Sequence, residues 1–288
     1  MGDDEINLVG LSYGTLLAQV VANTFPTRTG AIVLDGVVNP SWVAGKPGSI
    51  SWIREGADVA SWSVLKHFFE LCRQAGPERC DFAGRKSPRE KFATLAARLR
   101  KTPMDVPLTD GKRFSLGYPQ LVQGALSNLY YGWTWPTLGK LLDAVYDGRL
   151  KKVGQIISDF QVPAGDTYDN RQDAGMAISC ADTNNPNRLE RYRQIAQWHD
   201  RTVAPYFGSP WAYKALNCAE WQGRSTERYT GPWDTQTTKP VLVIGMLHDP
   251  GTPYRNAVTV AHLLKNSSLL TVDGVGHGAF FGNDCVTQ

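Results

Sequence analysis

A serine between two glycines is the first candidate for covalent chemistry in this chain of 288 residues. Residues Gly10-Leu11-Ser12-Tyr13-Gly14 read G-x-S-x-G, which places a serine on a sharp turn between a strand and a helix. The backbone NH after such a serine, at the start of the helix, faces the oxygen that becomes negative in acyl transfer. The bare pattern also occurs by chance in ordinary turns. Its flanks here favour Ser12 as nucleophile and Tyr13 as oxyanion donor.

A serine hydroxyl needs a neighbouring base to become a good nucleophile. Among the five histidines, His277 is the preferred base because it lies on a loop, Gly274 to Gly278, directly after the last predicted strand. His248 follows a strand end too, but the sequence gives less reason to direct it inward. The other three fall on predicted helices, where a structural role is expected: His67, His199 and His262.

The base in turn needs a carboxylate to orient it. Asp249 follows the predicted strand Val241 to Ile244, and Asp35 follows an earlier one, so both are candidates. Either could simply form a turn. The chain order Ser12, Asp249, His277 is the order of α/β-hydrolase triads, which favours Asp249 over Asp35.

Strands and helices alternate on both sides of these residues. Apolar runs of strand length occupy residues 6–11, 31–34, 240–245 and 268–272. Apolar residues recur at helical spacing from Leu16 to Phe25, where Pro26 ends the helix, and from Tyr254 to Lys265. Strand, helix and strand in succession predict an α/β fold with a parallel sheet. Ser12, Asp249 and His277 then share its carboxyl edge.

Helical patterns fill the middle of the chain. Ser87-Pro88-Arg89-Glu90 is a strong helix start, and helices are also expected over 118–131, 136–146 and 186–204. We therefore predict an α/β core made of residues 1–39 and 236–288, and a helical cap inserted over residues 40–235.

Composition excludes several classes of protein. Lys and Arg number 30 and Asp and Glu 27, and this balance is not that of a dedicated nucleic-acid binder. No apolar stretch approaches the ~20 residues that span a bilayer. No signal peptide is visible in the sequence. The sequence also has no phosphate-binding glycine loop and no Cys/His cluster with zinc spacing, so we expect neither a cofactor nor a metal.

The five cysteines leave two readings open. Each alone could be a buried free thiol, whereas two disulfides and one unpaired cysteine would indicate an oxidising compartment.

These segments together resemble the α/β-hydrolase serine peptidases, in particular the tripeptidyl-aminopeptidase-like branch related to prolyl aminopeptidases. Ser12-Tyr13-Gly14-Thr15 and Asp249-Pro250-Gly251-Thr252-Pro253 are its most specific parts. The matching segments, in the order of the family, are residues 7–15, 33–36, 177–182, 218–221, 240–253 and 276–278. The resemblance implies an α/β-hydrolase fold with Ser12 as nucleophile, Asp249 as acid and His277 as base.

The resemblance also bears on disulfides and on the extent of the chain. It implies that Cys180 pairs with Cys218, and a second pair of Cys72 with Cys80 is expected, which leaves Cys285. Together with cysteine usage it implies an extracellular or secretory protein. Family members have a hundred or more residues before the nucleophile strand, including a glycine-rich loop that supplies a second oxyanion NH. We expect this chain to be shortened at both ends relative to the family, as a fragment, a truncated gene model or one piece of a processed enzyme.

The implied reaction is hydrolysis at the N-termini of peptides through an acyl-enzyme. Asp182 and Glu220 are candidates to bind the α-ammonium group of the substrate, because each adjoins a cysteine of the expected cap disulfide. An esterase or lactonase on the same triad is one alternative, since the fold hosts many chemistries. A catalytically impaired remnant that binds a ligand is another. The sequence leaves the oligomeric state open.

Overall fold

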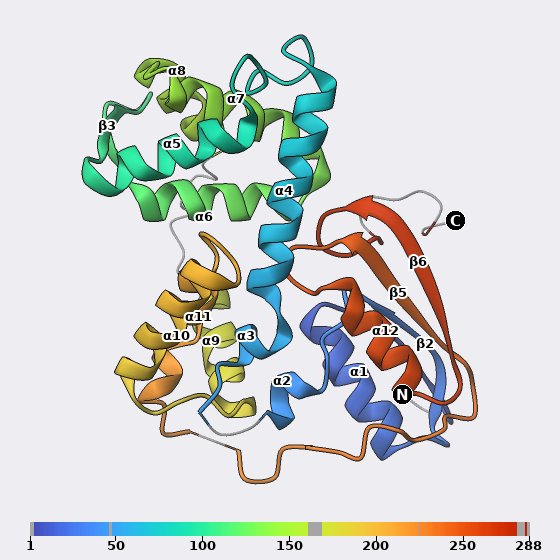
Figure 1. Ribbon diagram of the computed structural model, residues 1–288. Helices are drawn as coiled ribbons and strands as arrows, with labels where there is room; N and C mark the ends of the chain where they lie inside the picture. The colour runs from blue at the N-terminus through green and yellow to red at the C-terminus, as the bar shows by residue number, and fades with distance from the viewer. Residues whose placement is uncertain (1–2, 46–47, 161–168, 224, 281–285, 287–288) are drawn as a thin grey trace. The chain divides into compact units, whose positions relative to one another are not determined.

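A parallel sheet of four strands carries the candidate site residues (Figure 1). The computed structural model describes residues 3–45, 48–160, 169–223, 225–280 and 286. The strands lie in the order β1-β2-β5-β6 and all neighbours are parallel, which confirms the predicted sheet. They are β1 (Ile6–Leu11), β2 (Thr29–Asp35), β5 (Val241–His248) and β6 (Ser267–Val275).

The strand register places the candidate residues at one edge of this sheet. Leu11 is paired with Asp35, Asp35 with Ile244, and His248 with Val275. The residues that follow these strand ends therefore emerge on the same side, as parallel strands require. The last two strands are longer than the predicted ones, because pairing continues to His248 and Val275.

Two helices pack on the sheet through small and branched apolar residues. They are α1 (Tyr13–Thr24) and α12 (Tyr254–Leu263). Ala18 and Ala22 of α1 and Val260 of α12 lie in one buried cluster with Leu34 and Val243 of the strands. This cluster fixes the start of α1, and with it the turn that carries Ser12.

The chain divides into two compact units, residues 1–62 with 170–288, and residues 63–169. The first unit contains the sheet and further helices: α2 (Ser41–Ala44), α3 (Ser51–Glu55), α9 (Arg171–Asp182), α10 (Leu189–Thr202) and α11 (Gly208–Lys214). The long helix α4 (Ala57–Ala75) belongs to both units. The predicted division into a core and a cap over residues 40–235 stays a prediction.

The second unit is mostly helical. Its elements after α4 are α5 (Pro88–Lys101), β3 (Met104–Pro107), β4 (Arg113–Leu116), α6 (Tyr118–Leu129), α7 (Trp135–Tyr146) and α8 (Leu150–Phe160). α5 begins with the predicted capping box, in which Ser87 Oγ accepts from Glu90 N. The antiparallel β3–β4 hairpin and α8 were not predicted. The predicted helix 186–204 begins only at Leu189, as α10.

Both expected disulfides are present, one in each unit. Cys72 is bonded to Cys80 in the helical unit, and Cys180 to Cys218 in the other unit. Cys285 lies outside the described residues. Two disulfides are typical of proteins that fold in an oxidising compartment.

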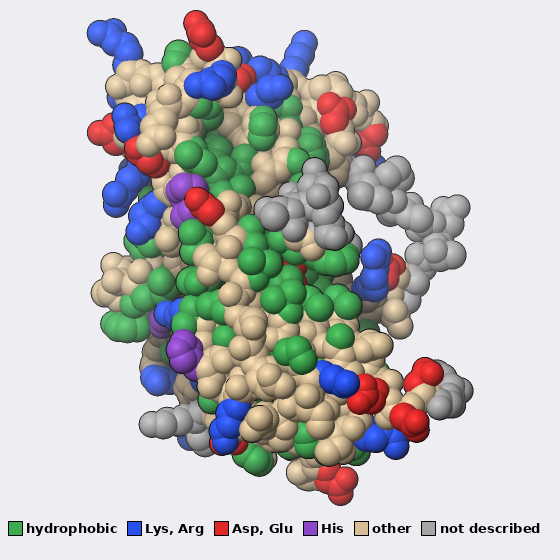
Figure 2. Space-filling view, turned by 90° about the vertical axis from the view of Figure 1, so that its right-hand side faces the viewer, with side chains coloured by type: hydrophobic (Ala, Val, Ile, Leu, Met, Phe, Trp, Pro, Cys, Tyr) green, Lys and Arg blue, Asp and Glu red, His purple; other side chains and the backbone are tan. Residues whose placement is uncertain are grey.

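Apolar side chains remain on the surface of the sheet-containing unit. Val9 of the edge strand β1 is 69% exposed, and Leu247, Leu269 and Leu270 on β5 and β6 are each more than a third exposed. Figure 2 looks from the β6 side of Figure 1 and shows hydrophobic side chains gathered on this face. No helix in the described residues is long and apolar enough to cross a membrane.

Candidate active site

Ser12 occupies a sharp turn between β1 and α1. Its backbone has φ 55° and ψ −123°, a conformation that non-glycine residues rarely adopt. Ser12 N donates to Asp35 O at 3.0 Å, and Ser12 O accepts from Thr15 N at 2.9 Å. These bonds hold the turn against the end of β2 and the first turn of α1. The side chain thus stands at the carboxyl edge of the sheet, where the sequence pattern predicts it.

The two glycines of the motif differ in what they allow. A Cβ on Gly10 would lie 2.6 Å from Gly14 O, so only glycine permits β1 to pass this close to α1. A Cβ on Gly14 would meet nothing within 4 Å. The close approach of strand and helix therefore depends on the first glycine, and the conformation of Gly14 leaves room for a side chain.

His277 and Asp249 are hydrogen-bonded across the ends of β6 and β5. His277 Nδ1 lies 3.0 Å from Asp249 Oδ2 and 3.1 Å from Oδ1. The Asp249 side chain is 1% exposed and that of His277 is 14% exposed. A Cβ on Gly36 would lie 3.3 Å from His277 Cε1, so the outer part of the imidazole ring faces the end of β2. Asp35, which precedes Gly36, is the residue whose carbonyl holds Ser12 N.

The loop around Asp249 supplies the carboxylate with several donors. Gly251 N and Thr252 N donate to Oδ1 at 2.7 and 2.8 Å, and Thr252 Oγ1 lies 2.8 Å from Oδ2. Thr252 Oγ1 also lies 3.3 Å from His277 Nδ1. Thr252 is a site residue that was not predicted, although its place three residues after Asp249 in a turn was a usable signal.

Asp35, the rival acid, has a different set of partners. Its carboxylate is 1% exposed and accepts from Ala279 N at 2.8 Å and from Phe280 N at 2.8 Å. Burial raises the pKa of Asp35, although the bonds from these amides oppose the shift. The carboxylate therefore holds the backbone that follows His277, while the imidazole nitrogen Nδ1 bonds to Asp249.

Opposing effects set the protonation of His277. Burial lowers the pKa of the imidazole, whereas the charge and hydrogen bond of Asp249 raise it, and the net pKa lies above its ordinary value. A pair of this kind stabilises an imidazolium once it has formed. It is therefore suited to a base that takes up a proton during reaction.

Tyr13 links the Ser12 turn to the end of α9. Its hydroxyl donates to Asp182 Oδ2 at 2.5 Å, and its ring lies 5.7 Å from that of Trp42. Burial, and then the hydrogen bond to Asp182, raise the pKa of the Tyr13 phenol. Asp182, a candidate for ammonium binding, thus lies beside the residue that follows Ser12.

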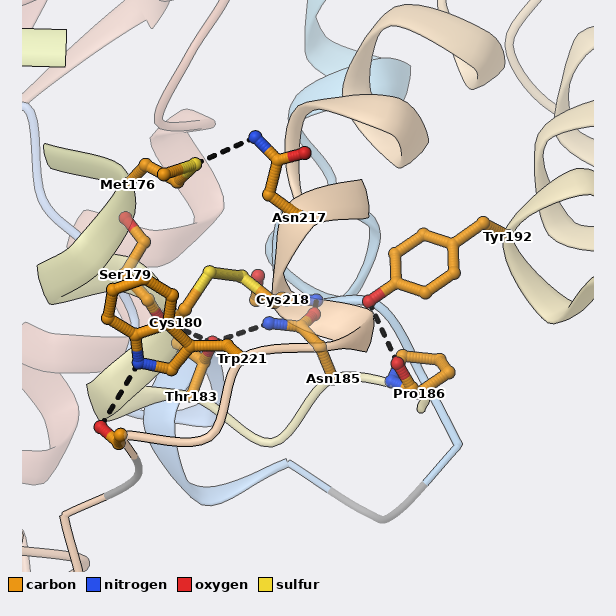
Figure 3. The surroundings of a disulfide bond; sticks show 12 residues. Met176, Ser179, Cys180, Thr183, Asn185, Pro186, Tyr192, Asn217, Cys218 and Trp221 are labelled. Atoms are coloured by element: carbon orange, nitrogen blue, oxygen red, sulfur yellow. Dashed lines mark hydrogen bonds between the residues drawn. A yellow bond between two sulfur atoms is a disulfide. The ribbon is translucent and has the colours of Figure 1, made fainter. Parts of the chain in front are cut away.

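Glu220, the second such candidate, lies just after the 3₁₀ helix Leu216–Ala219 and is exposed. The disulfide Cys180–Cys218 joins the end of α9 to this 3₁₀ helix (Figure 3). Near it lies a cavity of about 610 Å³, and Figure 3 shows three of its lining residues, Asn185, Pro186 and Trp221. Asp182 bonds the residue that follows Ser12, whereas no contact between Glu220 and the Ser12 turn is present among the described residues.

The remaining histidines have other surroundings. His199 Nδ1 lies 2.6 Å from Asp58 Oδ2, which makes a second His–Asp pair, and His262 Nδ1 bonds to Val258 O. The ring of His67 packs against Trp135, and His248 O accepts from Gly276 N. Within the described ranges, no group of three or more His, Cys, Asp or Glu side chains could hold a metal ion.

Part of this chain matches a known protein family, and the chain is similar to several known proteins. The model of the TAP-like protein family matches residues 204–288. The serine protease Hip1 of Mycobacterium tuberculosis (strain H37Rv) is 27% identical over 308 residues, which cover all of this chain and 55% of that protein. The tripeptidyl aminopeptidase of Streptomyces lividans is 23% identical over 310 residues and is covered to 52%.

A third relative has a different name. Carboxylesterase B of Mycobacterium tuberculosis (strain CDC 1551) is 29% identical over 187 residues, which cover 59% of this chain and 34% of that protein. The chain spans about half the length of Hip1 and the tripeptidyl aminopeptidase. The chain is therefore similar to the TAP-like protein family over residues 204–288, and over its whole length to relatives named as serine peptidases.

Proposed function

We propose that this chain carries the catalytic residues of a serine hydrolase that cleaves peptides through an acyl-enzyme. The observation that carries the proposal is the hydrogen bond between His277 Nδ1 and Asp249, at the same sheet edge as the Ser12 turn. The relatives named as a serine protease and a tripeptidyl aminopeptidase support the same chemistry.

In the proposed mechanism, His277 takes the proton of the Ser12 hydroxyl as the oxygen attacks the substrate carbonyl. Asp249 keeps the Nδ1 proton in place, so that the other ring nitrogen is the one that accepts. The Tyr13 NH donates to the developing oxyanion. His277 then protonates the leaving amine, and a water molecule releases the acyl group by the same steps in reverse order.

We further propose that the substrate is the N-terminus of a peptide. Asp182 is the better candidate to bind the α-ammonium group, because Tyr13 holds it beside the Ser12 turn. Tyr13 uses only Oδ2, so Oδ1 of the same carboxylate can accept from a ligand. Glu220 is the weaker candidate. The two disulfides and the relatives support a location outside the cytoplasm.

The test is labelling of the natural full-length protein with a fluorophosphonate probe. One adduct on Ser12, lost in Ser12→Ala and in His277→Ala but kept in His262→Ala, is expected. A fully folded protein without any adduct would contradict the proposal and favour a ligand-binding remnant. Asp182→Asn should then raise KM for tripeptide amides with a free N-terminus and leave N-acetylated esters unchanged. Glu220→Gln is the matched comparison.

An esterase is the second candidate function, favoured by the similarity to Carboxylesterase B over 187 residues. It keeps the same three residues and changes only the leaving group. Comparing kcat/KM for tripeptide amides and short-chain esters separates the two. An esterase would cleave the esters well and the amides hardly at all.

A further inference from the structure

Lys214, the last residue of α11, holds its ammonium group against two indole rings. Nζ lies 4.4 Å from the ring centre of Trp52 and 4.6 Å from that of Trp211. Among the residues that the structure describes, no hydrogen bond or ion pair to this nitrogen is found. An ammonium carries three donors and is strongly hydrated, so ring faces alone satisfy it poorly.

The side chain is accessible yet closely surrounded. Lys214 is an exposed residue, whereas Trp211 beneath it is 1% exposed. Desolvation nevertheless lowers the pKa of the Lys214 ammonium to about 8. The charge therefore lies along the protein surface rather than out in bulk water, and a solute that reaches it meets a partly dehydrated cation.

Lys214 is also close enough to the candidate base to affect it. Its positive charge lowers the pKa of His277, against the effect of Asp249. Both residues belong to the same compact unit. The positive charge of Lys214 therefore acts on the candidate base as well as on a ligand that approaches it.

A row of aromatic rings connects Lys214 with the Tyr13–Asp182 pair. Ring centres are 5.7 Å apart for Tyr13 and Trp42, 5.5 Å for Trp42 and Trp52, and 5.3 Å for Trp52 and Trp211. Each step exceeds the ~3.5 Å that one extended residue spans. Trp42 and Trp211 are each 1% exposed, so these two rings lie beneath the protein surface. A carboxylate, Asp182, lies at the first end of the row, and Lys214 lies at its other end.

We propose that Lys214 is a specificity-determining residue that binds a carboxylate on the acyl part of the substrate. The inference rests on the proposed function, in which the acyl part is the N-terminal segment of a peptide and Asp182 binds its α-ammonium group. Opposite charges at the two ends of the row then match a short N-terminal segment that contains Glu or Asp. The carboxylate would provide the acceptor that Nζ lacks.

The test compares tripeptide 4-nitroanilides that differ only in Glu or Gln, placed in turn at each of the three positions. At one position, kcat/KM for Glu should exceed that for Gln at least about tenfold, as expected for a charge-assisted hydrogen bond. Lys214→Met keeps the stem on the indoles and should reduce this ratio to about one, while Lys214→Arg should retain most of it. Lys239→Met, at another exposed lysine, is the control and should leave the ratio unchanged.

Binding to Ser12→Ala separates this inference from the proposed function. Calorimetric titration with the same Glu and Gln peptides should show the same preference without turnover, and Lys214→Met in that background should remove it. If the peptides bind with this preference but are never cleaved, the peptidase proposal fails and the role of Lys214 stands. Equal affinity for Glu and Gln at every position, or an equal loss for both in a folded Lys214→Met variant, would overturn the inference and leave Lys214 a structural residue.

Discussion

The two compact units differ in the partners of their buried charged side chains. In the helical unit, Lys91 is the one charged side chain among the described residues that is buried, and it is paired with Asp143 at 3.1 Å. In the other unit, four carboxylates are at most 2% exposed: Asp35, Glu55, Asp58 and Asp249. Each accepts hydrogen bonds, but none has a guanidinium or ammonium partner among the ion pairs of the described residues.

This difference shows where the molecule departs from the ordinary rules of packing. A helical unit built for stability buries apolar groups and pairs its rare charge. Buried carboxylates without a permanent cation are costly. Two of the four, Asp35 and Asp249, lie at strand ends and bond the loop that carries His277. The comparison therefore predicts that substitutions in the sheet-containing unit alter activity or pH dependence, whereas those in the helical unit alter stability alone.

The largest effect is expected at Asp249. Asp249→Asn should lower kcat by about 10⁴, because the amide no longer stabilises an imidazolium and favours the wrong tautomer of His277. The pKa of His277 should fall with the loss of the carboxylate, so the residual activity should persist to lower pH. Kinetics across pH 4–9 would measure both. Asp35→Asn is the matched variant, and a larger loss there than at Asp249 would reverse the assignment of the acid.

The second effect is a pH dependence of stability from Glu55. Burial raises its pKa to about 8, from an ordinary value of 4.5. The folded state thus binds a proton that the unfolded state releases, so the contribution of Glu55 is complete below pH 4.5 and is lost as pH rises to 8. The free energy of unfolding should drop by roughly 3–5 kcal/mol over this range because of Glu55.

Denaturant unfolding at pH 5 and pH 8.5 measures this drop. Glu55→Gln should flatten the dependence, since the amide oxygen can still accept from Asn39 N and Asn256 Nδ2. Glu227→Gln, at an exposed position, should not. A wild-type protein that is equally stable at both pH values would contradict the raised pKa of Glu55 in the folded state.

A smaller loss is expected for Thr252→Val. The variant keeps the shape of the side chain but removes the hydroxyl that bonds Asp249 Oδ2 at 2.8 Å. We expect kcat to fall about 10- to 100-fold, the cost of one hydrogen bond to a charged group. Thr252→Ser should restore most of it. Unchanged kcat in a folded Thr252→Val variant would show that the hydroxyl only shapes the loop.

The smallest effect lies in the helical unit. Ser87→Ala removes the side chain that caps α5, and it should lower the free energy of unfolding by about 1 kcal/mol. Hydrolysis measured well below the unfolding temperature should stay at the wild-type rate. A change in kcat would mean that the helical unit acts in the reaction, against the comparison above.

Much of the fold could be predicted from local patterns. Apolar runs of strand length and their alternation with helical patterns were sufficient for the parallel sheet and for α1 and α12. The β3–β4 hairpin was missed because each of its strands has only four residues and one ends in Pro107. Such short segments carry too little periodicity to be recognised.

The site could be predicted in part. Ser12, Asp249 and His277 follow predicted strand ends, as do Asp35 and His248, so this rule reduces the number of candidates without a structure. The catalytic roles of the three residues stay predictions. Whether Asp249 or Asp35 bonds His277 Nδ1 depends on how the loops after the strands fold, and the spacing of these residues in the sequence does not determine that. The Tyr13–Asp182 contact joins residues 169 positions apart, and the setting of Lys214 likewise arises only when distant helices pack.

The backbone of Ser12 has a consequence for protein engineering. At φ 55° and ψ −123° a side chain costs on the order of 1–3 kcal/mol, and glycine adopts this conformation without that cost. A library of variants screened only for heat resistance would therefore be drawn toward glycine at position 12. Enrichment of Ser12→Gly would mean that the screen selects higher stability at the expense of the proposed nucleophile. Position 12 should therefore be kept as serine in such a library.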